Sequence, residues 1–506
     1  MRNLPHRRGV AAAVLVAGAS TLAGCRIGPD PAPPEPAPPA EAFLVETKAP
    51  EGVGQSASTA IAPDPAWWRS LGDPALDELV SRAEARNQSL AASIASVRSA
   101  YAAVGASEAD LWPSIGAGAQ YQRTLTNIAQ LAASGVVVEP YDMYAYGVGM
   151  SSWEIDLWGG VRRQVEAAKA NAESELESLR DALVSMRAQV VSTYVQLRSL
   201  EAKRAVLAAN ADALVKTRDL VRARFAAGTT NDLDVARAEA QVDAVLAQIP
   251  QVDAGIASSR ATLAALCGGY PADIDPVLAR GGSVPEAPQV VGIGLPAELL
   301  DRRPDVRAAR RRVEAATALI GVAESQRLPR LTISGNFYIA SNNVSGLGDL
   351  ANKAYTIGPS LWLPLFEGGR IDSAIRQQQA EAEAALAAYR GVVLGAIADL
   401  GASVSDFVQA GETSRRSDAA VASAERALRL AQQQFDAGVT DFTTLLDVQR
   451  ALLEAESAAV DARGGVAQGY IALQKSLGSG WQDSEAIAAA TDADKKDSTE
   501  TTEHTP

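Results

Sequence analysis

The side chains most often used for catalysis and metal binding are scarce in this sequence. Its two histidines, His6 and His504, lie near opposite ends, and its two cysteines, Cys25 and Cys267, are far apart. A Ser–His–Asp triad, a Cys–His pair or a histidine-ligated metal site in the body of the chain is therefore excluded. The sequence also lacks a P-loop, a GxSxG motif and a dinucleotide fingerprint, which leaves only carboxylate-pair or lysine chemistry open. We expect no enzyme, no metal and no cofactor, and we expect Cys267 to be a small buried apolar residue.

The composition favours helices and argues against nucleic acid as a partner. Of the 506 residues, 47% are hydrophobic but only 5% are aromatic, and the net charge is −14. A chain rich in Ala, Leu and Val favours long, closely packed helices. Binding to phosphates needs concentrated Lys and Arg, which an acidic chain does not offer.

The first residues have the pattern of a secretion signal. Three arginines precede an apolar run, residues 9–19, that is too short to cross a bilayer, and Leu-Ala-Gly leads into Cys25. The pattern predicts a lipoprotein signal peptide, residues 1–24, and a covalent lipid on Cys25. An ordinary signal peptide with an incidental cysteine is the alternative. Arg26 rather than Asp follows the cysteine, so the usual signal for retention in the inner membrane is missing.

The body of the chain is one unit that occurs twice. Motifs of the first half recur in the same order in the second half, where Gly105, Trp153, Phe225 and Gly228 match Gly321, Trp362, Phe435 and Gly438. The predicted organisation is a proline-rich tether (25–64), a first repeat (65–270), a linker (271–295), a second repeat (296–480) and an acidic disordered tail (481–506).

Each repeat is predicted to contain a helix, two strands and two long helical stretches. The helices are at 74–111 and 296–327, the strands at 113–123, 143–157, 329–340 and 355–366, and the long stretches at 160–226, 230–267, 369–436 and 440–477. Apolar residues in the long stretches are spaced three and four apart, which is the seam of a left-handed coiled coil. A helix of this length reaches ~100 Å, so we expect rods or the wall of a tube. A soluble coiled-coil scaffold is the alternative.

The four predicted strands alternate apolar and polar residues over lengths that suit a tilted transmembrane strand. The alternation changes near Ser151 and Ser152, where we expect a bulge or the membrane edge. Four strands cannot close a barrel, since ~8 are needed, and an open edge in lipid is too costly. The strands therefore form either a small soluble sheet or a barrel to which several chains contribute.

Several motifs together resemble a known family. They are Trp67-Trp68 with Asp73-Pro74, Leu300-Asp301-Arg302-Arg303-Pro304-Asp305-Val306, Trp153-Glu154-Ile155-Asp156-Leu157-Trp158-Gly159, Leu365-Phe366-Glu367-Gly368-Gly369-Arg370, and Phe435-Asp436-Ala437-Gly438-Val439 before Leu445-Leu446-Asp447-Val448-Gln449-Arg450. These motifs resemble the outer-membrane efflux lipoproteins of Gram-negative bacteria, the TolC-like and OprM-like (NodT-type) channels of tripartite pumps.

The resemblance implies a mainly α fold with a small membrane β part, assembled as a homotrimer. Its 12-stranded barrel would continue into a helical tunnel across the periplasm. The implied function is a passive export duct for drugs or small molecules, lipid-anchored in the outer membrane. An adaptor protein and an inner-membrane RND-type transporter would open it at the periplasmic end. A duct for type I protein secretion and a lipid-anchored scaffold that forms no pore are the alternatives.

Two tips between long helices are candidate docking sites. Gly228-Thr229 and Gly438-Val439 each follow a long helix and precede another, so a helix C-cap and turn is their structural interpretation. The resemblance implies that these turns also meet the adaptor at the periplasmic end.

A candidate channel aperture follows the second tip. Asp447 by itself has the pattern of a solvated helix charge, but the resemblance places an acidic constriction there, and three copies around one axis would attract cations. Thr443 lies one turn earlier on the same face, at a ring position that is apolar in some relatives, and Arg450 is a local partner for Asp447. The first repeat has Arg237 where the second has Asp447, so the two hairpins are not equivalent.

Overall fold

The computed structural model describes residues 26–30, 56–58, 64–125, 140–293 and 301–482. The signal peptide, Cys25, most of the tether and nearly all of the acidic tail lie outside the described residues. The chain divides into two compact units, and each takes segments from both halves of the sequence. Unit 1 is Met1–Pro34, Ser99–Ser174 and Ala309–Ala388, and unit 2 is Glu35–Arg98, Glu175–Ala308 and Tyr389–Pro506.

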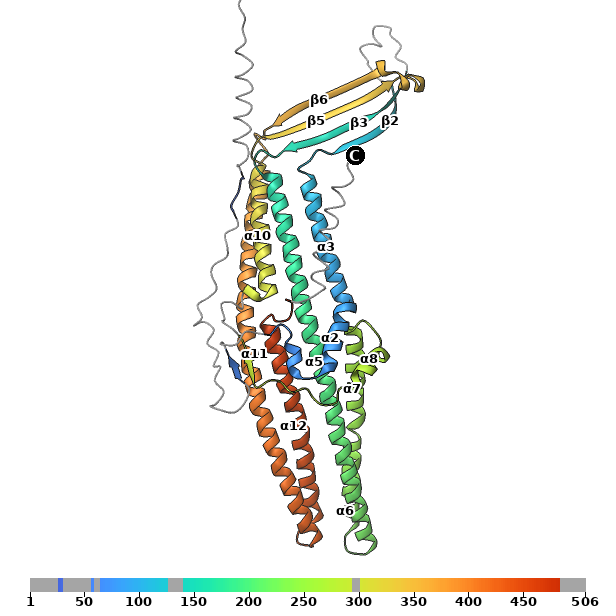
Figure 1. The fold of residues 1–506 in the computed structure, drawn as a ribbon, viewed down its shortest axis with the longest axis vertical. Coiled ribbons are helices and arrows are strands. Elements are labelled where there is room, and N and C mark those ends of the chain that lie inside the picture. Colours follow the sequence, from blue (N-terminus) through green and yellow to red (C-terminus); the bar gives the residue numbers. More distant parts are fainter. Residues whose placement is uncertain (1–25, 31–55, 59–63, 126–139, 294–300, 483–506) are drawn as a thin grey trace, which may run out of the picture. The chain divides into compact units, whose positions relative to one another are not determined.

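Unit 1 contains a four-stranded antiparallel sheet, which lies at one end of the helical segments of that unit (Figure 1). Its strands, in the order β2-β3-β5-β6, are Ile115–Thr124, Tyr141–Ile155, Arg330–Ser341 and Lys353–Trp362. The register of β3 against β5 shifts between Met150 and Trp153, which confirms the predicted bulge. In the part of the chain that the structure describes, no strand pairs with the outer edge of β2 or of β6.

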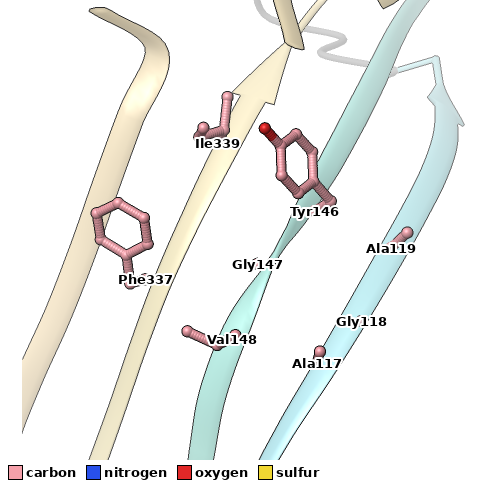
Figure 2. A pocket seen from close by; sticks show the side chains of 8 residues that line it. All are labelled: Ala117, Gly118, Ala119, Tyr146, Gly147, Val148, Phe337 and Ile339. Atoms are coloured by element: carbon pink, nitrogen blue, oxygen red, sulfur yellow. The ribbon is translucent and has the colours of Figure 1, made fainter. Parts of the chain in front are cut away.

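The two faces of the sheet differ in chemistry, as the alternation predicts. Strand register places large apolar residues on one face, where Val148 and Phe337 are opposite each other and Ile357 is 72% exposed. Figure 2 shows this face between β2, β3 and β5. The opposite face carries small and polar residues, which are Gly116, Gly118, Gln120, Gly147, Gly149, Thr332, Asn336 and Thr356. Exposure of the apolar face is the reverse of what a soluble sheet needs.

Aromatic residues gather at both ends of the strands. Tryptophans lie where β2 begins and where β3 and β6 end, whereas tyrosines lie toward the other end. These residues are Trp112, Trp153 and Trp158 at the first end and Tyr121, Tyr144 and Tyr355 at the second, and the register places Trp153 and the three tyrosines on the apolar face. Trp362, at the end of β6, and Tyr338 lie on the opposite face. Two aromatic girdles around an apolar band are typical of a strand that crosses a membrane.

Three of the four long helical stretches match their predicted bounds within two residues, and the fourth is broken. Helix α5 spans Gly160–Ala226 and α11 spans Arg370–Asp436, each 67 residues long, and α12 spans Phe442–Ser476. The stretch predicted at 230–267 is two helices, α6 (Asp232–Leu246) and α7 (Ile249–Leu266), with Pro250 in the first turn of α7. Proline has no amide hydrogen to donate, so it is tolerated at a helix start but not inside one.

The helix predicted at 74–111 is also broken. Helix α2 spans Pro74–Arg86 and α3 spans Gln88–Ala109. Asn87 separates them, because its side-chain oxygen accepts a hydrogen bond from the Leu90 amide at 3.0 Å and so caps α3.

The remaining elements are short, apart from α10. Helix α10 spans Pro304–Ser325, within the predicted 296–327. The others are the helix α8 (Pro271–Leu278), the 3-10 helices η2 (Trp67–Leu71), η3 (Val344–Gly348) and η4 (Leu350–Asn352), and the parallel pair β1 (Ser56–Ser58) and β4 (Val290–Gly292).

The two helical hairpins of unit 2 share one core. Residues of the predicted heptad seam from α5, α6 and α7 pack together with residues from α11 and α12, and the set includes Leu207, Leu214, Val221, Val242, Val245, Val252, Phe435, Leu445 and Leu446. The α5–α6 and α11–α12 pairs therefore pack by burying their seams against each other. Cys267 is 4% exposed, which confirms its predicted burial, and burial raises its thiol pKa to about 11.

Two glycines on the polar face of the sheet give a matched test of strand packing. A Cβ on Gly147 would lie 2.2 Å from the Phe337 carbonyl oxygen, whereas a Cβ on Gly118, its partner in register, would have no atom within 4 Å. We expect Gly147→Ala to lower the free energy of unfolding by about 1–3 kcal/mol, because the strands must move apart. Gly118→Ala should change it by less than about 0.5 kcal/mol. Denaturant titration in detergent, followed by circular dichroism, measures both, and equal effects would contradict the packing argument.

Candidate functional site

The two tips of unit 2 have the same backbone geometry. Gly228 and Gly438 have φ angles of 72° and 73°, which is the left-handed region that glycine adopts at little cost. The Thr229 amide donates to the Arg224 carbonyl at 2.9 Å, and the Val439 amide donates to the Gln434 carbonyl at 2.8 Å. These are Schellman caps, so the structural interpretation of both motifs holds. A Cβ on either glycine would meet nothing within 4 Å, so both turns are open to a partner.

The side chains around the two tips are not equivalent. Phe225 is 45% exposed, whereas its counterpart Phe435 is 7% exposed and packs against Phe442 with ring centroids 5.9 Å apart. The Arg224 guanidinium lies 4.3 Å from the centre of the Phe435 ring and 3.5 Å from an Asp436 carboxylate oxygen. Arg224 therefore joins the end of α5 to the end of α11 by a cation–π contact and an ion pair.

Sequence reasoning missed Arg224. Residues 224 and 435 lie far apart in the chain, and their contact exists only because the two hairpins pack together. A basic residue in the last turn of a helix is usually explained by the helix dipole. The position of Arg224 in the sequence therefore did not indicate a contact with the second hairpin.

The predicted aperture residues lie on one face of α12, against α6. Thr443 accepts a hydrogen bond from Arg237 at 2.8 Å, and Arg450 lies 3.5 Å from Asp447 and donates to Gln241 at 2.9 Å. The structure thus brings the three predicted residues together and adds the α6 residues Arg237 and Gln241. Both charged side chains of the Asp447–Arg450 pair are at least half exposed, so this pair contributes little to stability.

These geometries define a class of protein. The sheet has an exposed apolar face, aromatic girdles and outer edges that pair with no described strand, and the long heptad hairpins end in glycine turns. This combination is typical of the chain of an outer-membrane channel with a helical extension. The model of the family described as "outer membrane efflux protein" matches residues 79–269 and 295–479. The chain belongs to the outer membrane efflux protein family.

Relatives and solved structures agree with this assignment. The pyoverdine export outer membrane protein OpmQ of Pseudomonas aeruginosa is 30% identical over 82% of this chain and 87% of its own length. Nodulation protein T of Rhizobium leguminosarum bv. trifolii is 28% identical over 91% and 95%. The structure of the outer-membrane channel OprN superposes with a TM-score of 0.79 at 31% identity and covers 90% of this chain and 100% of that one.

The N-caps of α6 and α12 differ in chemistry, and this difference predicts that acid weakens the cap of α12 but not that of α6. The Asn231 side chain accepts from the Asp234 amide at 3.0 Å, and the Asp441 side chain accepts from the Thr444 amide at 2.8 Å. Hydrogen bonds from the Thr444 side chain and amide lower the pKa of Asp441 below its usual 3.8. Because the pKa of Asp441 is lower in the folded state, the ionised cap stabilises α12 fully at pH values above its usual pKa. This stabilisation is lost as the pH falls through the lowered pKa.

Hydrogen exchange measures this difference. On acidification we expect the protection of the Thr444 amide, normalised to its intrinsic exchange rate, to fall, while that of the Asp234 amide stays constant. Asp441→Asn keeps the acceptor and removes the titration, so it should abolish the pH dependence. Equal loss of protection at both tips would show that the effect does not come from Asp441.

Proposed function

We propose that this protein is the outer-membrane duct of a tripartite efflux system and works as a homotrimer. The observation that carries the proposal is the sheet, whose apolar face is exposed and whose outer edges, on β2 and β6, have no partner among the described strands. Unsatisfied backbone groups are not tolerated in lipid. Three chains that join β6 of one to β2 of the next would give a closed barrel with more than the ~8 strands that are needed.

The two faces of the sheet indicate how such a barrel would be oriented. The apolar face would contact lipid, and the face with Gly116, Gly118, Gly147 and Gly149 would line a pore. Glycine leaves room for solute and offers no specific pocket. This supports passage of varied small molecules without chemistry in the wall.

Helix α11 supports assembly from several copies. It contains an 18-residue apolar stretch of which only 28% is buried by this chain, and Leu394 is 68% exposed. In the proposed trimer neighbouring copies cover this surface and complete a helical tunnel in the periplasm.

The α12 face is the proposed gate. Three copies of Asp447 around the trimer axis would form an acidic ring that attracts cations. The contacts of Arg237 with Thr443 and of Arg450 with Gln241 join the two hairpins of one chain. An adaptor that docks on the Gly228 and Gly438 turns would separate these hairpins, and an inner-membrane RND-type transporter would supply the energy.

Conductance across planar bilayers tests both the pore and the gate. We expect the purified protein to form cation-selective channels, and Asp447→Ala to lower the cation-over-anion permeability ratio at least about twofold, because a ring of negative charge is lost. Glu425→Ala is the control, since it removes one acid from α11 that is paired with Arg429 at 3.9 Å. Absence of conductance would favour a scaffold that forms no pore. An unchanged ratio in Asp447→Ala would place the constriction elsewhere.

The proposed lipid on Cys25 anchors the mature chain in the outer membrane. Cys25 follows Leu-Ala-Gly, and small residues before the cysteine suit cleavage by a signal peptidase. We expect labelled palmitate to be incorporated into the full-length protein and to be lost in Cys25→Ser, with Cys267→Ser as the control. Retention of palmitate in Cys25→Ser would contradict this site.

A further inference from the structure

Residues 26–30, directly after the proposed lipidation site, contact the body of unit 1. The Ile27 amide donates to the Trp158 carbonyl at 3.1 Å, and Ile27 and Gly28 are half-buried. Arg26 lies 2.5 Å from a carboxylate oxygen of Glu166. This segment therefore makes specific contacts at the junction between the end of β3 and the start of α5.

The central residue of this contact is Arg163. Its side chain is 0% exposed although it lies in the first turns of α5, where the helix dipole disfavours a cation. A buried arginine is costly unless its donors are satisfied. Arg163 donates to the Ile27 carbonyl at 2.9 Å, the Gly28 carbonyl at 3.1 Å and the Asp30 carboxylate at 2.8 Å.

Glu166 supplies the remaining partner, at 2.8 Å from Arg163. Burial alone would lower the pKa of the Arg163 guanidinium, but the hydrogen bonds to Glu166 and Asp30 raise it above its usual value, so the group stays charged. The guanidinium thus has partners chiefly because residues 27–30 are present. Of these four partners, three belong to residues 27–30, and only Glu166 lies on α5 itself.

Shape complementarity adds a second constraint that does not involve Arg163 hydrogen bonds. Gly28 has a φ angle of 89°, and a Cβ there would lie 2.4 Å from the Cα of Gly321 on α10. A Cβ on Gly321 would in turn lie 2.6 Å from the Ile27 carbonyl oxygen. Two facing glycines allow the backbones to approach at a distance that no other residue permits.

We propose that Arg163 and Gly321 form a socket that holds residues 26–30 and so fixes the acyl anchor of Cys25 at the junction of sheet and helices of its own chain. Cys25 is bonded to Arg26, and consecutive Cα atoms are 3.8 Å apart, so the lipid is attached beside the socket. Trp158, whose indole donates to the Pro329 carbonyl at 2.7 Å, belongs to the aromatic girdle at this junction. The girdle is the level of the membrane interface, which is where acyl chains must enter the bilayer. Residues 26–30, which the sequence assigns to the tether, are therefore held by the body of unit 1.

A nitroxide label at residue 29 tests the socket in the full-length lipidated protein, reconstituted in phospholipid vesicles. Pro29 is exposed, so Pro29→Cys can be labelled, while Cys267 is buried with a thiol pKa of about 11 and does not compete. We expect an immobilised label in the parent protein. Arg163→Gln should shorten its rotational correlation time about fivefold, because the segment is released. Arg327→Gln is the matched control, since Arg327 pairs with Asp372 instead.

A second variant keeps the test independent of any folding defect of Arg163→Gln. Gly28→Ala leaves the body of the protein unchanged and should mobilise the label to the same degree, since the added methyl group collides with Gly321. A mobile label in the parent protein, or an immobile label in both variants, overturns the socket. The proposal also rests on lipidation of Cys25, and palmitate incorporation tests that point separately. If the label is immobile but no palmitate is incorporated, the contact of residues 26–30 with the socket stands and the acyl anchor at Cys25 is overturned.

Discussion

The backbone hydrogen bonds at the edges of one small sheet govern the rest of this molecule. A strand in lipid must pair on both sides, and the four described strands of one chain leave the outer edges of β2 and β6 without partners. Further copies of the chain, in the proposed trimer, would supply the partners that these two edges lack. The alternating apolar and glycine-rich faces then have a simple meaning. In the proposed barrel one face would contact hydrocarbon, and the other would contact water and solute.

The helical hairpins show how a duplicated unit acquires two roles. Both hairpins contribute heptad residues to a single core, so they are held together by the same apolar packing. Their polar faces have diverged, because α6 carries Arg237 where α12 carries Asp447. The contact between Arg224 and Phe435 adds a further asymmetry at the tips. In the proposed gate, this difference in side chains would let one hairpin move relative to the other.

The fold could be predicted where its cause is local periodicity. The bounds of α5 and α11, the bulge near Ser151 and the faces of the strands all follow from spacing that the sequence displays directly. The helix breaks were wrongly predicted as continuous helix, although Pro250 and Asn87 carry the physical reason for them. In each case the apolar pattern continues through the break, whereas a single residue ends the helix.

The candidate sites also contain features that follow from local sequence and contacts that depend on tertiary packing. Sequence by itself determined the class of protein, the two glycine turns and the face of α12 that holds Thr443, Asp447 and Arg450, because residues one helical turn apart must share a face. Only the tertiary structure decided that Arg237 and Gln241 oppose this face, that Arg224 covers Phe435, and that Arg163 holds the segment after Cys25. Hydrogen bonds and cation–π contacts act over a few ångströms, so their partners are set by which segments pack together. That packing joins residues more than a hundred positions apart, and no local pattern encodes it.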